Sequence, residues 1–335
     1  MAQLHRTTLQ DIADHVKLSR SSVALALRTT QSECPLLPET WTLINDAALR
    51  LNYRPNRLAL SLSKGTSGYI GIVSEGTPAL GVFSGRLIHH LSQSLSRNGQ
   101  EILLIDTSGP AKQWIGKLSD GRIDGAVVVP PAQSLLRLHL NKIGVPLVGL
   151  NLAFDEVGVV TVRPDDAQAI ALLATHLVEL GHRQVAFFQD DRAQSSHYST
   201  QERQAAFRAD PRIRALGRPP LVLRQVHECL EAIRSRQATA IIGYSDLDAL
   251  VLLTAAQSVG LSVPRDVSIL GINDDPYVSS ITPALTTVSL EPAMLADTAC
   301  QHLMDALAGR PHDAREIRLP VRLCIRSSTA PPSAS

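Results

Sequence analysis

Residues 8–28 read Thr-Leu-Gln-Asp-Ile-Ala-Asp-His-Val-Lys-Leu-Ser-Arg-Ser-Ser-Val-Ala-Leu-Ala-Leu-Arg. Thr8 followed by Asp11 is a capping-box-like helix start, because the hydroxyl can accept a first-turn amide bond and the carboxylate lies near the positive helix end. After a short break, Ser19 can cap a second helix. Both helices have an apolar stripe, made by Ile12, Ala13 and Val16 and by Val23, Ala26 and Leu27. The stretch therefore predicts two short helices joined by a tight turn.

Two helices joined so closely are typical of a helix-turn-helix unit, whose second helix places its N-terminal residues in the major groove of DNA. Arg20 and Ser21 occupy that position, and Arg28 also points outward in the predicted helix. An arginine there can pair bidentately with guanine, which contributes roughly 1–3 kcal/mol of discrimination. An ordinary helical hairpin at the start of a globular chain is the structural alternative.

A third helical pattern begins near Pro38 and ends near Asn52, and Pro55 starts a further short run. In these segments the chain resembles the lac repressor and galactose repressor family of bacterial transcriptional regulators. The residues that carry the resemblance are Thr8-Leu9-x-Asp11-Ile12-Ala13, Leu18-Ser19-x-Ser21-Ser22-Val23-x-x-Ala26-Leu27, Pro38-Glu39-Thr40 and Tyr53-x-Pro55-Asn56-x-x-Ala59-x-x-Leu62.

The resemblance implies that the run after Tyr53 is a hinge helix that becomes ordered on operator DNA. It also implies that Leu62 wedges into the minor groove, at a cost of about a few kcal/mol per unstacked base step. A leucine that packs within a helix is the alternative role for Leu62. The expected DNA-binding residues are Thr8, Ser19, Arg20, Ser21, Ser22, Arg28, Tyr53, Asn56, Arg57, Ala59 and Leu62.

Several positions of the headpiece depart from the family pattern. Lys17 stands where the family usually has a turn glycine, and Leu25 and Leu60 replace arginines. The loop that precedes Pro38 is also longer than usual. We therefore expect direct base readout to depend more heavily on Arg20, Ser21 and Arg28.

Composition is consistent with a regulator of this kind. The 335 residues are enough for a small headpiece and a two-lobed domain. The whole chain has a formal net charge of +1, and residues 1–64 hold eight basic and five acidic residues, so stable operator binding is expected to need two headpieces in a homodimer. Four cysteines show neither metal-ligand spacing nor a disulfide pattern, namely Cys34, Cys229, Cys300 and Cys324. With no signal peptide and no apolar run near 18 residues, we expect a cytoplasmic protein that uses no membrane, metal or cofactor.

From about residue 68 the sequence alternates between apolar, β-branched runs and helical stretches, which predicts an α/β fold of parallel sheets covered by helices in one or two doubly wound lobes. The expected strands are 69–74, 101–106, 125–129, 146–151, 159–162, 184–189, 240–244 and 267–272. The expected helices are 85–97, 167–180, 200–209, 246–259 and 294–307.

The family resemblance continues through this region, in His176-Leu177-x-x-Leu180-Gly181-His182-Arg183, Val263-Pro264-x-Asp266-Val267-Ser268 and Thr282-Pro283-x-Leu285-Thr286-Thr287-Val288. It implies a helix-turn-helix headpiece (1–52), a hinge helix and linker (53–66), a periplasmic-binding-protein-like effector-binding and dimerisation domain (67–330) and a tail (331–335). Its first lobe is expected at about 67–161 and 291–317, and its second at about 162–290 and 318–330. We expect His182 and Arg183 to be helix-end cations rather than ligand contacts.

Ligands of open α/β sheets bind beyond the carboxyl ends of the strands. Polar residues that can bind sugar hydroxyls follow the expected strands at Asn151, Asp165-Asp166, Asp190-Asp191, Ser245-Asp246 and Asn273-Asp274. By the resemblance, Arg203 is the effector-binding arginine, Asn273 replaces a family aspartate and Ser245 a family asparagine. The expected effector-binding residues are Phe83, Asn151, Arg203, Tyr244, Ser245 and Asn273. Helix capping for the polar residues and core packing for the aromatic ones are the alternatives.

The change at Asn273 favours a sugar acid or sugar phosphate, held partly by Arg203, over a neutral sugar. A carbohydrate-processing enzyme and a ligand carrier are rival functions on the same fold. The run Gly243-x-Ser245-x-Leu247 lacks the second glycine of a nucleophile elbow, and His89-His90 lack a further metal ligand at helical spacing. We therefore expect a transcriptional regulator, most simply a repressor, whose lobes close on a small carbohydrate-like effector and so change the spacing of two headpieces.

Overall fold

The computed structural model describes residues 7–54, 65–75, 81–130, 143–153, 159–190, 197–310 and 315–333. Its contacts divide the chain into two units, Met1–Ser67 and Gly68–Ser335. Each unit has its own buried apolar core. Within the described residues, no helix is both long and apolar enough to cross a membrane.

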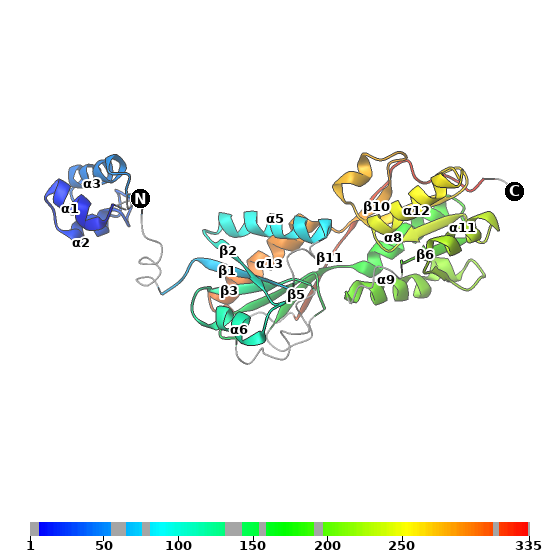
Figure 1. The fold of residues 1–335 in the computed structure, drawn as a ribbon, viewed down its shortest axis with the longest axis horizontal. Coiled ribbons are helices and arrows are strands. Elements are labelled where there is room, and N and C mark those ends of the chain that lie inside the picture. The colour runs from blue at the N-terminus through cyan, green and yellow to red at the C-terminus, as the bar shows by residue number, and fades with distance from the viewer. Residues whose placement is uncertain are drawn as a thin grey trace. The chain divides into compact units, whose positions relative to one another are not determined.

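The smaller unit, which we call the headpiece, contains helices α1 (Leu9–Val16), α2 (Arg20–Ala26) and α3 (Pro38–Arg50) (Figure 1). Thr8 caps α1 in a capping box with Asp11, and the Ser19 hydroxyl accepts a hydrogen bond from the amide of Ser22 at 3.0 Å. Both predicted caps are therefore confirmed. The apolar stripes meet in one core made of Ile12, Ala13, Val23, Ala26, Ile44, Ala47 and Ala48.

Lys17 ends α1 in the left-handed region, with φ 57° and ψ 41°. A residue with a Cβ is strained there, and glycine is the residue that adopts this conformation freely. We predict that Lys17→Gly stabilises the headpiece by about 0.5–1 kcal/mol, the relieved strain being partly offset by the entropy of glycine in the unfolded chain. Thermal unfolding followed by the fluorescence of Trp41, in chains that also carry Trp114→Phe, measures this. Lys17→Ala, which keeps the Cβ, is the control. Equal stability of the two variants would contradict the strain argument.

The first lobe of the larger unit is a parallel sheet with the strand order β11-β5-β4-β3-β1-β2. Its strands are β1 (Tyr69–Ser74), β2 (Glu101–Asp106), β3 (Gly125–Val128), β4 (Leu147–Leu150), β5 (Val160–Pro164) and β11 (Glu316–Leu319). Helices α5 (Val82–Arg97) and α13 (Pro292–Leu307) cover one face, and α6 (Ala111–Ser119) lies on the other (Figure 1).

The second lobe has the strand order β12-β10-β9-β8-β6-β7, and only the pair of β10 and β12 is antiparallel. Its strands are β6 (Val185–Phe188), β7 (Leu221–Leu223), β8 (Ala240–Gly243), β9 (Ser268–Asn273), β10 (Thr286–Ser289) and β12 (Arg322–Cys324). Helices α8 (Asp166–Glu179), α9 (Tyr198–Ala209) and α10 (Pro211–Arg214) cover one face, and α11 (Val226–Arg234) and α12 (Asp246–Ser258) cover the other. A short 3-10 helix, η3 (Pro276–Ser279), follows β9.

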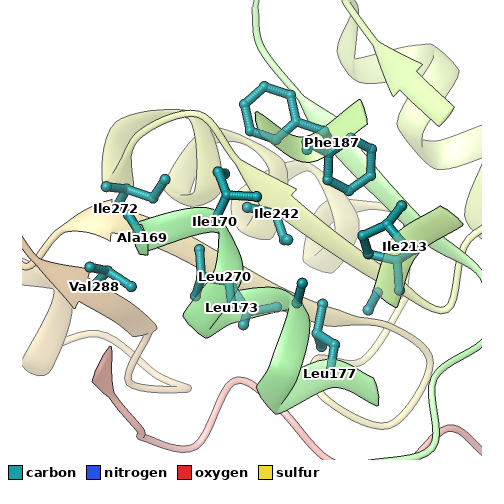
Figure 2. Close-up of a cluster of buried hydrophobic side chains, with 14 of the residues drawn as sticks. Ala169, Ile170, Leu173, Leu177, Phe187, Ile213, Ile242, Leu270, Ile272 and Val288 are labelled. Atoms are coloured by element: carbon teal, nitrogen blue, oxygen red, sulfur yellow. The ribbon is translucent and has the colours of Figure 1, made fainter. Parts of the chain in front are cut away.

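The core under α8 explains why the sequence of this helix is so apolar. Ala169, Ile170, Leu173 and Leu177 project from α8 toward the sheet, where they meet Phe187, Ile242, Leu270, Ile272 and Val288 (Figure 2). Ala169 and Ile170 are both fully buried in this core. The helix is therefore fixed firmly against the sheet, and so is its first residue, Asp166, which is 0% exposed.

His182 has a structural role at the helix end, as the sequence predicted, but through hydrogen bonds rather than as a cation. Its side chain is buried, Nδ1 lies 2.9 Å from the Thr239 hydroxyl, and Nε2 lies 2.9 Å from the carbonyl oxygen of Ala330. Burial lowers the pKa of His182, so the ring is favoured in its neutral form. His182 therefore ties the end of α8 to the C-terminal segment by hydrogen bonds, and it is not a cation that complements the helix dipole.

The chain passes between the lobes three times, from β5 to α8, from β10 to α13 and from β11 to β12. All three passages follow directly on the carboxyl end of a strand. The residues at these strand ends therefore lie at the junction of the lobes, where side chains from both can meet.

Candidate functional site

The exposed face of α2 is the first candidate site. Arg20 and Ser21 are exposed on its first turn, directly after the cap residue Ser19. The Ser22 hydroxyl lies 2.8 Å from that of Ser19, so these two hydroxyls satisfy each other. Arg28 is exposed just beyond the end of the helix, and neither Arg20 nor Arg28 forms an ion pair with another described residue. The first turn of the helix thus offers an exposed cation and a hydroxyl, and a second exposed cation follows the helix at Arg28.

The other predicted DNA-binding residues of the headpiece have different positions. The Thr8 hydroxyl donates to Asp11 Oδ2 at 2.8 Å within the capping box, so it also serves the helix. Tyr53 is partly buried against the headpiece core. Asn56, Arg57, Ala59 and Leu62 lie outside the described residues.

The second candidate site lies at the lobe junction and is centred on Arg203, whose residue is 4% exposed. Its Nε lies 2.5 Å from Oδ1 of Asp166, and its Nη1 donates to the main-chain oxygen of Tyr244 at 2.7 Å. The guanidinium carbon stands 4.9 Å from the centre of the Tyr244 ring. Burial alone would lower the pKa of Arg203, but the Asp166 carboxylate more than offsets it, and the pKa lies above its ordinary value. Arg203 is therefore a permanent cation whose charge is already neutralised by Asp166.

A chain of hydrogen bonds runs from Tyr244 to the first lobe. The Tyr244 hydroxyl lies 2.8 Å from that of Ser199, and Ser199 contacts Nδ1 of His197. Nδ1 also accepts from the Ser199 amide at 3.3 Å, so His197 is the N-cap of α9. Its Nε2 donates to the carbonyl oxygen of Asn151 at 2.7 Å, which fixes the proton on Nε2. We call Asn151, Asp166, His197, Ser199, Arg203 and Tyr244 the interlobe cluster.

The tautomer of His197 leaves no room for a second proton, because Nδ1 is needed as an acceptor. Desolvation by burial lowers the pKa of His197 to about 4, although the Asn151 carbonyl partly opposes the shift. Asn151 is buried and holds a left-handed backbone with φ 56°. His197 is therefore a neutral link between the end of β4 and the start of α9.

Helix α5 makes a second connection across the junction. Phe83 packs against the buried cores of both lobes. Arg86 Nη1 donates to the main-chain oxygens of Asn273 at 3.3 Å and Asp274 at 2.7 Å, and lies 3.6 Å from Oδ1 of Asp275. Asn273 and Asp274 both have positive φ, of 133° and 53°. The first lobe thus binds the carboxyl end of β9 through the Arg86 side chain, which contacts mainly the backbone of the β9 end.

Asp246 lies in the interior behind this end of β9 and is 0% exposed. Its two oxygens accept from the Thr287 hydroxyl at 2.5 Å and from the Asp275 amide at 2.7 Å. Burial raises the pKa of Asp246 to about 7, and the nearby carboxylates of Asp275 and Asp274 add to the rise. The site therefore contains a carboxyl group that titrates near neutral pH.

The structure brings Asn151, Arg203 and Tyr244 into one network and places Phe83 and Asn273 at the same junction. Ser245 has the alternative, structural role: its hydroxyl donates to the Asp248 carboxylate and accepts from the Asp248 amide at 3.2 Å, which caps α12.

Sequence reasoning missed Arg86, His197 and Ser199. No local pattern identifies them, since they become site residues only through partners far away in the chain. Within the described residues, no group of three or more His, Cys, Asp or Glu side chains is arranged to hold a metal ion.

Comparison with known proteins places this geometry among related molecules. Residues 174–329 match the periplasmic binding protein-like domain family. The chain is similar to the transcriptional repressor PurR of Aliivibrio fischeri (24% identity over 337 residues, 96% of this chain and 98% of PurR). It is also similar to the transcriptional regulator MalR of Streptomyces coelicolor (27% over 344 residues, 97% of each chain). A crystal structure of the lac repressor dimer bound to operator and the anti-inducer ONPF has the same fold, with a TM-score of 0.80, 22% identity and coverage of 97% of this chain and 99% of that one.

Proposed function

We propose that this chain is a member of the lac repressor and galactose repressor family, and that it is a DNA-binding transcriptional repressor whose operator affinity is changed by a small carbohydrate-like effector. The observation that carries the proposal is the exposed pair Arg20 and Ser21 on the first turn of a capped helix α2, in a unit with its own core. The curated relatives that match along nearly the whole chain are transcriptional regulators and not enzymes, which supports the same conclusion.

The effector is proposed to bind at the interlobe cluster. Asp166 Oδ2 and the nearby Tyr198 hydroxyl are both buried, and neither has a hydrogen bond of good geometry among the described residues, so a ligand hydroxyl can bond to this pair. The charge of Arg203 is already neutralised by Asp166. An anionic ligand would therefore gain little from Arg203 and would be repelled by the Asp166 carboxylate. We therefore revise the expectation drawn from Asn273 and propose a neutral, hydroxyl-rich effector in place of a sugar acid or phosphate.

The proposed mechanism is a population shift in a homodimer. Two headpieces on one operator bind more tightly than one, so a change in their spacing weakens binding. Closure of the lobes around the effector would produce that change. A nearly complete switch needs a difference of about 5.5 kcal/mol in effector affinity between the two states, and several hydrogen bonds to buried polar groups can supply a large part of it.

Arg20→Ala tests the DNA-binding half of the proposal. The full chain is first used to select binding sites from a pool of random duplexes. We expect Arg20→Ala to weaken binding to the selected duplex by about 5- to 150-fold, the loss of one bidentate base contact, and to change binding to random DNA little.

The control is Arg50→Ala, which removes an exposed cation from α3 without touching α2. It should affect both DNAs alike. If Arg20→Ala weakened binding to the selected and the random duplex equally, Arg20 would be a phosphate contact and the assignment to base readout would fail. A thermal-shift screen of the full chain against neutral sugars, sugar acids and sugar phosphates tests the effector class.

A further inference from the structure

Helix α9 contacts the two lobes through different faces. Ser199 and Arg203 contact the second lobe at Tyr244 and Asp166, as described above. Glu202, next to Arg203 in sequence, contacts the first lobe instead. Its Oε2 pairs with Nη1 of Arg163, and its Oε1 lies 3.3 Å from Nη1 of Arg318. One helix therefore carries both the central arginine of the interlobe cluster and a carboxylate directed at the neighbouring lobe.

The partners of Glu202 lie on adjacent strands. Arg163 is in β5 and Arg318 is in β11, and these two residues are paired in the parallel register. Both also bind Glu316, Arg163 through Nε and Arg318 through Nε at 2.7 Å. Each guanidinium thus contacts both carboxylates. We call Arg163, Glu202, Glu316 and Arg318 the α9 clasp.

Arg163 is the most buried member of the clasp, whereas the side chains of Arg318 and Glu316 are 42% and 37% exposed. The side chain of Arg163 is 7% exposed and that of Glu202 is 26% exposed. The guanidinium carbon of Arg163 also lies 4.7 Å from the centre of the Tyr198 ring, on the first turn of α9. The pair of Arg163 with Glu202 is therefore screened less by salt than an exposed pair, and removing Glu202 leaves the buried Arg163 with Glu316 alone. The clasp therefore fixes the start of α9 to the edge of the first sheet.

The position of the clasp links it to the cluster through the backbone. Arg163 is followed by Pro164, where β5 ends, and Asp166 begins α8 in the second lobe. The same short passage between the lobes therefore carries the cation that holds Glu202 and the carboxylate that holds Arg203. A displacement of α9 at Arg203 must be accompanied by a displacement at Glu202, because the two residues are neighbours on one helix.

We propose that Glu202 is a positioning residue for the effector response, which transmits occupancy of the interlobe cluster to the first lobe through its ion pairs with Arg163 and Arg318. This inference rests on the proposed function, since it concerns how the same cluster is read out. Glu202 itself need not touch the effector. Its role is to make the orientation of the lobes depend on the position of α9.

Amide hydrogen exchange of the full chain tests the mechanical part of this proposal without DNA or effector. In Glu202→Gln, which keeps the shape and removes the charge, we expect exchange about tenfold faster in α9 and in β11 and unchanged exchange in β8, a central strand of the second lobe. Glu231→Gln, an exposed change on α11, is the matched control and should alter none of these segments. No acceleration at α9 and β11, or equal acceleration in β8, would overturn the assignment of Glu202 as a tie between the lobes.

Binding to the selected duplex tests transmission. A residue with a purely structural role would leave the affinity of the folded protein for DNA unchanged, whereas we expect Glu202→Gln to change it by about fivefold or more in the absence of effector. If Glu202→Gln bound the selected duplex with the same affinity as the wild type and as the control Glu231→Gln, the proposed role of Glu202 in transmission would be wrong. If the wild-type chain selected no DNA sequence at all, the proposed function would fail, whereas the exchange experiment would still decide whether Glu202 ties the lobes.

Discussion

Arg203→Ala is expected to lower the free energy of unfolding of the larger unit by about 3–5 kcal/mol, which is the usual cost of breaking a buried ion pair from one side. The variant leaves the Asp166 carboxylate, which is 0% exposed, without its cation, and it leaves the main-chain oxygen of Tyr244 without its donor. Urea unfolding of the full chain, followed by circular dichroism, measures the effect as a shift of the transition of the larger unit.

Two further variants show whether burial is the cause. Arg97→Ala breaks an ion pair with Asp297 of similar length, 2.7 Å, in which the two side chains are 63% and 56% exposed. Such exposed pairs contribute about 0–1 kcal/mol, so this variant should unfold almost like the wild type. The double variant Arg203→Met with Asp166→Leu removes both charges and should recover most of the loss. Similar losses for Arg203→Ala and Arg97→Ala would contradict the interpretation of Arg203 as one half of a buried pair.

The sequence predicted the apolar strands well and the polar or partly exposed strands poorly, for a physical reason. The limits predicted for β1 and β2 are those observed, because both are apolar runs bounded by polar residues or glycine. Strand β10 escaped prediction because its sequence, Thr-Thr-Val-Ser, is mostly polar, although every residue of it is buried. Strands β11 and β12 are short and partly exposed, so they lack a strong apolar signal. Polar strands of this kind are recognised only once their neighbours are known.

The sequence predicted the residues at the strand ends of the candidate site but not the partners that they contact. The rule that ligands bind beyond strand ends identified Asp166 and Asp246 as polar residues at the junction, and the fold places both there. The rule does not say which residues meet them. His197 bonds to Asn151 across 46 positions of the chain, and Arg86 bonds to Asn273 across 187. Contacts at such separations depend on how the two lobes pack, which no local pattern records. The pairing of Arg203 with Asp166 lies within the second lobe, 37 positions apart, and depends in the same way on how α8 and α9 pack.

The second large effect is on the pH dependence of stability. The site contains a histidine whose pKa is lowered and an aspartic acid whose pKa is raised. His197, with its pKa lowered to about 4, stays neutral in the folded protein while the unfolded chain takes up a proton below about pH 6.5. The unfolded state then binds more protons, so this group makes stability rise with pH between about 4 and 6.5. Asp246, with its pKa raised to about 7, keeps a proton in the folded protein after the unfolded chain has lost it above about pH 4. This group makes stability fall as pH rises from about 4 to 7.

The two contributions oppose each other in the wild type, so removing either one should reveal the other. For His197→Gln we expect the free energy of unfolding to change between pH 4 and 6.5 in a different way from that of the wild type. Relative to the wild type, it should fall by about 2–3 kcal/mol as the pH rises across this window, and we call this difference the tilt. Asp246→Asn should give a tilt of the opposite sign and of similar size. Urea midpoints of the three proteins at half-unit steps of pH measure the tilts, and comparison with the wild type cancels other titrating groups such as His176 and His182. Tilts of the same sign in both variants would contradict the assignment, because a neutral histidine and a protonated aspartic acid in the folded state require opposite signs.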